Sequence, residues 1–392
     1  MTLTELAYYL RKYFPLGVLI FVVLLILYLS LKIVQLTLPS TPMVVVPTPT
    51  PAFGQLAPIQ LPNAAPLPTN LQYVMDTVEG VPLTATTSAK IYFVPKKTPN
   101  LGFREKAGLL AKTLLFDDGT TTSKLDAPSD TYTLVDRSKR LIVDISNFNY
   151  TFSQEFDEDT QQYLANMTMP DEDSIKSKGQ EIFRSLNRYP ADIAQGTQTI
   201  SYVAYREASG SAQATAEIVP NPWDANMVAI DVFPPKIGTI DTVTEDYVSS
   251  PNRVVFIPQR STKDFVVKAQ VAVYERSEDQ YSNYPLKTGD QVFADLHAGK
   301  GYVIQGGDNL AGKSLMKIKK MYLAYLIPGF YTPYIQPVYV FIGEDNFVAY
   351  VPAVLDTWVQ GGQVIAPEVV SPSVVVLPTE PPTLTPISIP VR

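Results

Sequence analysis

Between residues 71 and 358 the chain is dominated by short runs in which apolar and polar residues alternate. In DFVVKAQVAVYER, for example, Ala269, Val271 and Val273 recur at every second position, which is typical of a half-buried antiparallel strand. The last such run, FVAYVPAVL, contains Pro352, and we expect it at a sheet edge because proline cannot donate to a neighbouring strand. Comparable runs are KIYFVP, TYTLVD and RLIVDISNF, the last two joined like a hairpin.

Three segments have helical spacing instead. The first covers residues 104–116, the second starts at Asp171 with acids in its first turn, and the third starts with a capping box formed by Thr288 and Gln291. Their predicted buried positions are Ala107, Leu110, Ala111 and Leu114; Ile175, Ile182, Phe183 and Leu186; and Val292, Phe293 and Leu296.

Together these patterns predict an α+β fold in which a helix is followed by an antiparallel meander, with helices on one face of each sheet. The acidic run EFDEDT and the loop through Pro170 indicate a domain boundary. We therefore expect a small α+β domain at residues 71–160 and a larger one at 171–358, the latter built from one or two helix-plus-meander units.

Residues 14–31 contain no charge and would span about 27 Å as a helix, which matches the hydrocarbon core of a bilayer. The apolar run continues to residue 37, so we predict a single transmembrane helix at 14–37. A cleaved signal peptide and a buried soluble helix are the alternatives, but no small-residue cleavage pattern and no polar face is present. Arg11 and Lys12 precede the run, which predicts that residues 1–13 are cytoplasmic and everything after the helix is outside the cell membrane.

The 34 prolines are concentrated on both sides of the strand-rich region. Repeated prolines remove backbone donors, so residues 38–70 are predicted to be a Pro/Thr-rich, polyproline-like linker. Residues 359–392 have the same character and are predicted to be a disordered tail.

The composition limits the reactions and ligands that are open to this chain. The chain has no cysteine and one histidine, so it lacks thiolate chemistry and most transition-metal ligands, and we predict no metal or cofactor. Its net charge of −7 argues against nucleic-acid binding. His297 ends the third predicted helix, where a dipole-capping role is favoured over catalysis.

Residues 307–314, GDNLAGKS, match the phosphate-binding loop of nucleotide hydrolases. That loop works only where it joins a buried strand to the start of a helix. The next segment, LMKIKKMYLAYLI, has the alternation of a strand, so a glycine-rich hairpin loop with a solvated Lys313 is the favoured interpretation.

Two other kinds of site need weighing. Adjacent acids, such as Asp117 and Asp118, are compatible with a hydrolase but usually point into solvent. Phe330, Tyr331 and Tyr334 gather in PGFYTPYIQP between two predicted strands, as exposed aromatic residues do at partner-binding surfaces. The alternative is that they cover the end of a sheet.

The stretch from TGDQVFADLHAGKGYVI through YIQPVYVFIGEDNFVAYVPAV resembles the closing module of the YycH/YycI type of membrane-anchored proteins, related to PepSY-like domains. The resemblance implies an extracytoplasmic α+β body that regulates a sensor kinase at the membrane without catalysis. The long proline-rich spacer is a departure from that pattern.

The sequence therefore predicts a single-pass, membrane-anchored bacterial protein whose extracytoplasmic part binds or regulates an envelope partner, or serves as an envelope scaffold, without being an enzyme. An envelope hydrolase that uses acidic residues is the alternative, and nucleotide binding through residues 307–314 is a third hypothesis.

Overall fold

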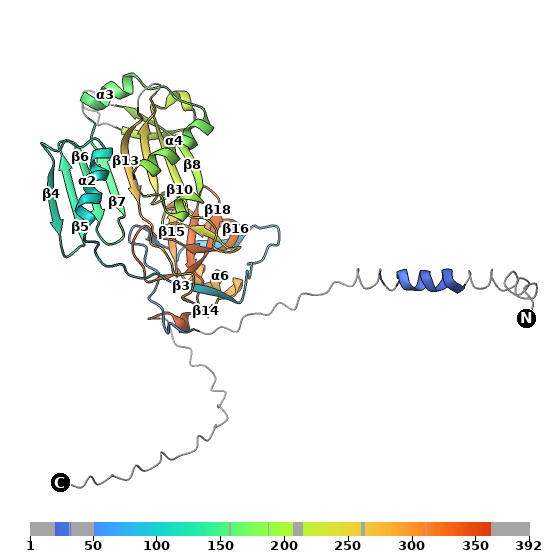
Figure 1. Ribbon diagram of the computed structural model, residues 1–392. Coiled ribbons are helices and arrows are strands. Elements are labelled where there is room, and N and C mark those ends of the chain that lie inside the picture. Colours follow the sequence, from blue (N-terminus) through green and yellow to red (C-terminus); the bar gives the residue numbers. More distant parts are fainter. Residues whose placement is uncertain are drawn as a thin grey trace, which may run out of the picture. The chain divides into compact units, whose positions relative to one another are not determined.

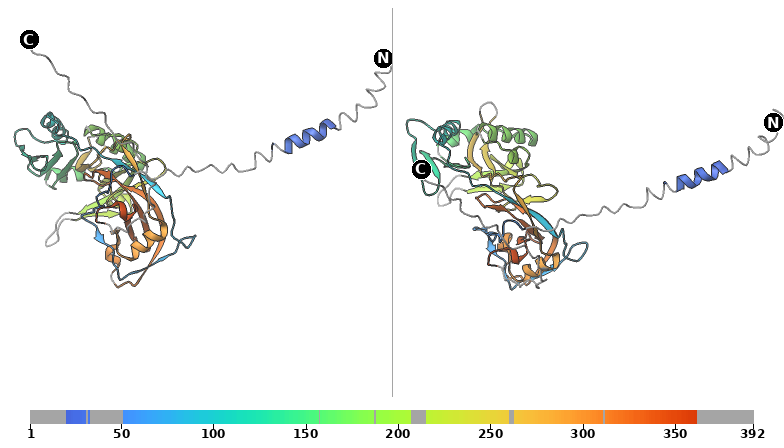
Figure 2. Two further views of the ribbon diagram at one scale, coloured as in Figure 1. Left: turned by 90° about the horizontal axis from the view of Figure 1, so that it is seen from below. Right: turned by 60° about the horizontal axis from the view of Figure 1, so that its bottom comes forward.

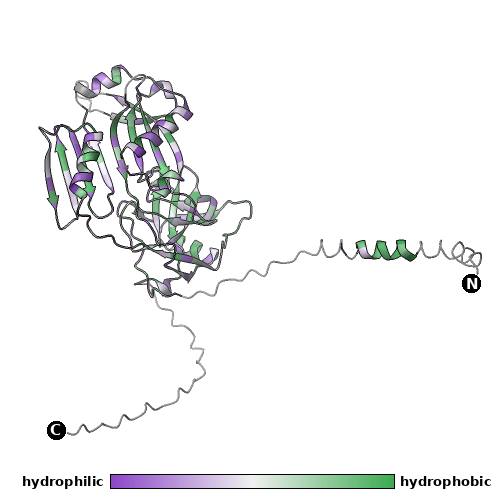
Figure 3. Ribbon diagram, viewed as in Figure 1, coloured by the Kyte–Doolittle hydropathy of each residue, from purple (hydrophilic) through white to green (hydrophobic). Residues whose placement is uncertain are grey.

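The computed structural model describes residues 20–30, 32, 51–156, 158–186, 188–206, 215–259, 263–310 and 312–361. By backbone contacts the chain divides into two units, residues 1–47 and 48–392. In the first unit residues 20–30 are α-helical and mostly apolar (Figure 3). The remainder of the predicted span 14–37, apart from Lys32, lies outside the described residues, as do residues 1–13. Within the described residues, no helix combines the length and the hydropathy needed to cross a bilayer.

The second unit is built on three sheets, with few helices (Figure 1). The largest sheet has nine strands, antiparallel throughout. In spatial order its strands are β4 Thr122–Asp126, β5 Thr131–Asp136, β6 Lys139–Asp144, β7 Tyr150–Gln154, β13 Phe265–Val271, β12 Arg253–Ile257, β10 Met227–Phe233, β8 Thr197–Arg206 and β9 Thr215–Val219.

The helices of this sheet follow from the sequence pattern. They are α2 Phe103–Thr113, α3 Glu158–Ala165, α4 Glu172–Ser185 and α5 Ala191–Ala194, with the 3₁₀ turn η1 Pro222–Asp224. The second predicted helix begins one residue later than predicted, because Asp171 is its N-cap and accepts a hydrogen bond from the Ser174 backbone amide at 3.0 Å. The predicted apolar faces of α2 and α4 are buried against strand residues such as Leu141 and Ile230.

The sheet is covered on both faces, which corrects the prediction of helices on one face. Alternate residues of β10 explain this: Val228 and Ile230 join the core under α2, α4 and α5, whereas Met227 and Ala229 join a separate cluster with Tyr163 and Leu164 of α3. A strand whose residues are buried on both sides is apolar at consecutive positions, as MVAIDVF is apart from Asp231.

A second sheet has seven strands and is mixed rather than antiparallel. It contains β1 Ala65–Pro66, β15 Tyr302–Gln305, β19 Val348–Pro352, β18 Pro337–Gly343, β16 Leu315–Leu326, β11 Asp241–Val243 and β2 Gln72–Met75, the last two paired in parallel with β16. The edge predicted for the run with Pro352 is wrong: β19 lies between β15 and β18, and Pro352 is tolerated because it is the final residue of the strand.

Helix α6 Gly289–His297 contributes Val292 and Leu296 to the core of this sheet. Its predicted capping box is confirmed, with Thr288 accepting from the Gln291 amide and Gln291 accepting from the Thr288 amide. A third, three-stranded sheet is formed by β14 Tyr281–Pro285, β3 Ser88–Phe93 and β17 Tyr334–Ile335. The remaining 3₁₀ turns are η2 Gly307–Leu310 and η3 Asp356–Trp358.

The linker predicted at residues 38–70 needs correction. Residues 38–50 lie outside the described residues, but residues 51–70 are folded: Leu56, Leu61 and Leu67 are buried, and β1 pairs with β15. Proline prevents regular structure without preventing burial, and the leucines between the prolines supply the apolar contacts. The first residues of the tail predicted at 359–392 also belong to the folded part, since Val359 and Gln360 pair with Leu56; residues 362–392 lie outside the described residues.

The predicted domains 71–160 and 171–358 do not correspond to separate sheets. β7 pairs with β13, so residues before and after the predicted boundary form one sheet. Conversely β2 and β3, from the start of the predicted small domain, pair with β16 and β14. Figure 2 shows the same interleaving, with blue early segments among the orange and red strands. Local patterns find strands, but only long-range pairing decides which sheet each one joins.

Candidate functional site

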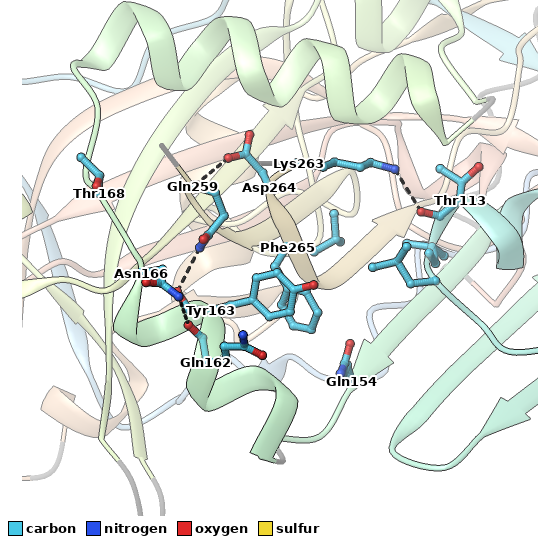
Figure 4. A pocket seen from close by; sticks show the side chains of 13 residues that line it. Thr113, Gln154, Gln162, Tyr163, Asn166, Thr168, Gln259, Lys263, Asp264 and Phe265 are labelled. Carbon is cyan, nitrogen blue, oxygen red and sulfur yellow. Dashed lines mark hydrogen bonds between the residues drawn. The ribbon is translucent and has the colours of Figure 1, made fainter. Parts of the chain in front are cut away.

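A pocket of about 600 Å³ lies beside the nine-stranded sheet, between the end of α2, helix α3 and the connection from β12 to β13 (Figure 4). We call it the amide pocket because four carboxamide side chains line it. Its lining residues are Thr113, Leu114, Leu115, Gln154, Gln162, Tyr163, Asn166, Thr168, Gln259, Lys263, Asp264, Phe265 and Val266.

Helix α3 is held over the pocket by aromatic packing and by the residues after it, which pair with the sheet connection. The Tyr163 ring stacks on Phe265 with centroids 4.0 Å apart. After the helix, Met167 forms an antiparallel bridge with Gln259, whose Nε2 donates to the Tyr163 carbonyl at 3.0 Å. Gln154, the last residue of β7, is only 7% exposed and contributes its amide from the sheet side.

The charged groups at this pocket are engaged with the protein itself. Both Asp264 oxygens accept hydrogen bonds from Lys178 Nζ, at 2.6 and 2.8 Å. Asp264 Oδ1 also accepts from the backbone N–H of Gln259 at 2.8 Å. Lys263 Nζ donates to the Thr113 carbonyl at 3.2 Å. Gln259 and Asn166 also donate from their side-chain nitrogens to main-chain carbonyls, and Thr113 donates its hydroxyl to the Leu109 carbonyl. The groups that can meet a ligand are therefore mainly amide oxygens, the Gln162 carboxamide and an aromatic ring.

Phe330, Tyr331 and Tyr334, the predicted partner-binding residues, come together at a second pocket of about 400 Å³. We call it the aromatic pocket. Opposite these three residues it is lined by part of the segment 57–62, which the sequence assigned to the linker. The Gln336 amide donates to the Ala57 carbonyl at 2.9 Å and ties the two sides together.

The three aromatic residues are half-buried. Tyr334 stacks on Phe53 with centroids 5.0 Å apart, and Tyr331 donates from its hydroxyl to the Val94 carbonyl at 3.2 Å. Burial raises the pKa of Tyr331 above its usual range, so this hydroxyl stays a donor at neutral pH. The three rings are packed against the body and also line a pocket, so partner binding through them stays a prediction.

Residues 307–314 do not have the surroundings of a phosphate-binding loop. Residues 307–310 form the 3₁₀ turn η2, and the next element is strand β16, which confirms the predicted strand. Lys313 was predicted to be solvated, but it forms an ion pair with Asp345. The predicted hairpin is also wrong, because β19 and β18 lie between β15 and β16 in the sheet.

His297 lies in the last turn of α6, as predicted, and packs edge-on against Tyr73 and Phe293 at centroid distances of 5.5 and 4.8 Å. The predicted acid pair also has local roles. Asp117 accepts from the Gly119 amide at 2.9 Å, and Asp118 pairs with Lys112 at 3.2 Å.

A group of acids that the sequence did not single out lies at a third pocket, of about 300 Å³, lined by Glu245, Asp246 and Arg253 among others. Asp231, 1% exposed on β10, lies next to it and accepts from the Ser250 amide at 2.8 Å. Burial raises the pKa of both Glu245 and Asp231. Glu245 and Asp246 are consecutive in the chain, but Asp231 comes from β10, so only the fold brings the three acids together.

No family model and no curated protein matches the chain. A solved structure of an uncharacterised protein from Eubacterium rectale is similar over 73% of this chain and 87% of that chain, with 10% sequence identity and a TM-score of 0.33. A similarity at this TM-score carries no argument about fold or function.

Proposed function

We propose that this is a membrane-anchored binding protein, with residues 14–37 in the cell membrane and the three-sheet body outside. The uncharged run 14–31 and the flanking Arg11 and Lys12 support this topology. Protease treatment of intact cells tests it: cleavage within the body with an N-terminal tag protected is the expected result. A body that resists protease until the cells are lysed would refute the topology.

The amide pocket is the observation that carries the binding role. Asp264, the one carboxylate among its described lining residues, is held by Lys178 and by a backbone amide, which leaves it poorly placed to move protons for a substrate. The four carboxamides and two threonine hydroxyls can instead accept hydrogen bonds without carrying charge, although Gln259, Asn166 and Thr113 already donate to main-chain carbonyls.

A neutral sugar is the ligand class that fits best. Sugar hydroxyls pair with carboxamides in both directions, and the less polar face of a sugar ring can pack on an aromatic ring such as Tyr163. A cationic ligand gains little, because Asp264 is already paired with Lys178. The pocket volume of about 600 Å³ is sufficient for a short oligosaccharide.

Titration of the full chain in detergent with neutral oligosaccharides, including N-acetylated ones, tests this assignment. We expect saturable binding that Gln162→Ala weakens by about tenfold, the effect of about 1.4 kcal/mol of hydrogen bonding. Gln161→Ala is the matched control, since Gln161 precedes it on α3 and does not line the pocket. Equal sugar affinities in the two variants would show that the amide pocket is not the binding site.

The same topology accommodates the regulatory or scaffolding role, in which Phe330, Tyr331 and Tyr334 bind an envelope protein. The resemblance to YycH/YycI proteins motivates a sensor kinase as that partner. Cross-linking in intact cells, comparing the wild type with Phe330→Ala, tests this part of the proposal; unchanged cross-linked products would exclude this residue from the interface.

The hydrolase alternative rests on one observation, the raised pKa of Glu245 beside Asp246 at the third pocket. A half-buried carboxyl that retains its proton at higher pH is suited to general acid catalysis. Glycosidase and peptidase substrates offered to the wild type and to Glu245→Gln provide the test. Turnover lost in that variant alone would favour the enzyme over the binding protein.

A further inference from the structure

The end of the described body lies beside one wall of the aromatic pocket. Leu56 and Val359 form a parallel bridge, in which the Leu56 amide donates to the Trp358 carbonyl and the Gln360 amide donates to the Leu56 carbonyl, each at 2.8 Å. Gly361 follows with φ of 78°, so the backbone turns there. The C-terminal segment 362–392 therefore starts next to residue 56.

The residues immediately after Leu56 line the aromatic pocket. Ala57, Pro58, Ile59 and Gln60 line it together with Phe330, Tyr331 and Tyr334. An extended chain advances about 3.3 Å per residue. The pocket lining begins at Ala57, directly after Leu56, so a few residues beyond Gly361 are enough to reach into the pocket.

The pocket chemistry matches the composition of that segment. Aromatic rings flanked by prolines form the kind of surface that recognises proline-rich segments, which lose little conformational entropy on binding. Residues 362–372 read GQVIAPEVVSP, with two prolines and four aliphatic β-branched residues. The folded body already holds one such segment here, since residues 57–62 read APIQLP.

We propose that residues 362–372 of the chain's own C-terminal segment bind in the aromatic pocket. Attachment at Gly361 gives this segment a local concentration in the millimolar range, so a weak contact is occupied before a free peptide competes. This assignment concerns a different pocket from the sugar-binding proposal and does not depend on it. It also gives the predicted partner surface an occupant that a partner has to displace.

Hydrogen exchange followed by mass spectrometry tests the proposal in the full chain and in a chain ending at Gly361, both in detergent. We expect amides in residues 328–336 to exchange at least threefold faster in the shorter chain, while amides of β6 stay unchanged as the internal control. A synthetic peptide of residues 362–372, added to the shorter chain, should restore the protection.

A second variant separates docking from a general effect of truncation. In the full chain, replacing Val364, Ile365 and Val369 by serine should reproduce the faster exchange, because these residues supply the apolar contacts. Equal exchange in the full and shortened chains would overturn the proposal. Protection that disappears on dilution would also overturn it, because the segment would then come from a second copy.

Discussion

Leu56 and Val359 form a parallel bridge between the two ends of the described body, and the Leu56 side chain is 0% exposed. This contact joins a segment that the sequence assigned to a linker with one assigned to a tail. It makes both segments part of the folded unit, which has a direct consequence for stability.

We expect Leu56→Ala to lower the free energy of unfolding of the full chain by about 2–5 kcal/mol, the usual effect of truncating a buried leucine. Val78→Ala is the control, because the Val78 side chain is fully exposed. Urea unfolding measures both. For the same reason a fragment 71–358 should unfold at lower urea than a fragment 51–361, and equal midpoints would contradict the bridge.

A buried ion network at the end of α6 leads to the second prediction. Lys287, 7% exposed in its side chain, contacts Asp295 at 2.7 Å and Asp356 at 2.5 Å. Replacing it by methionine leaves Asp295 and Asp356 with Lys300 as a more exposed partner, at 3.1 and 3.5 Å, so we expect a loss of about 1–3 kcal/mol in urea unfolding. Lys313→Met is the matched control, since its more exposed pair with Asp345 should contribute less than about 1 kcal/mol.

Lys313→Met also tests the nucleotide hypothesis. Lys313 is paired with Asp345 and precedes a strand, so no helix N-terminus is available to hold a phosphate. We expect that neither ATP nor GTP changes the melting temperature of the wild type or of the variant. A shift in the wild type that the variant loses would revive the phosphate-binding interpretation.

The sequence predicted local structure well where one short segment contains the whole signal. The capping box at Thr288, the acids in the first turn of α4, the buried faces of α2 and α4, and strand β16 are all confirmed. In each case the determining interactions lie within a few residues of one another, as helix caps and alternation require.

Features that depend on long-range pairing could not be predicted. Whether Leu56 belongs to a linker or to a core depends on a partner near the other end of the chain. The amide pocket combines residues from α2, α3, β7 and β13, and carboxamides have no sequence signature of their own. Phe330, Tyr331 and Tyr334 were found because they are close in sequence, but the opposite wall of their pocket was not.

A pH dependence is expected from Asp136, which is 3% exposed. Burial opposes ionisation of this carboxyl, but hydrogen bonds from Thr120 Oγ1 and the Asp117 amide outweigh it, and the pKa is lowered. A lowered folded-state pKa contributes stability above the unfolded-state value of about 3.9, and that contribution is lost as pH falls through the folded-state pKa.

Asp136→Asn should therefore cost about 1–3 kcal/mol at pH 7, and the difference from wild type should shrink as the pH falls below about 4. Urea unfolding at a series of pH values measures it. Thr120→Val should show a smaller loss of the same sign, because it removes one of the two hydrogen bonds. A difference that stays constant down to acid pH would show that the carboxylate charge is irrelevant.

The last prediction concerns two helical glycines with opposite surroundings. A Cβ at Gly179 of α4 would lie 2.2 Å from Ile230 Cδ1 on the sheet below, whereas a Cβ at Gly108 of α2 would meet nothing within 4 Å. Alanine at Gly108 should stabilise the protein by about 0.5–1 kcal/mol through helix propensity. Alanine at Gly179 gains the same propensity but overpacks a fully buried core, so we expect a net loss of about 1–2 kcal/mol.

The double variant Gly179→Ala with Ile230→Val identifies the cause. Valine lacks the Cδ1 atom that the new methyl group would meet, so the double variant should be more stable than the sum of the single changes predicts. Thermal or urea unfolding of the four proteins gives the coupling, which we expect to exceed about 1 kcal/mol. Strict additivity would mean that α4 moves away from the sheet to admit the methyl group, and that its contact with β10 is less tightly constrained than the distance indicates.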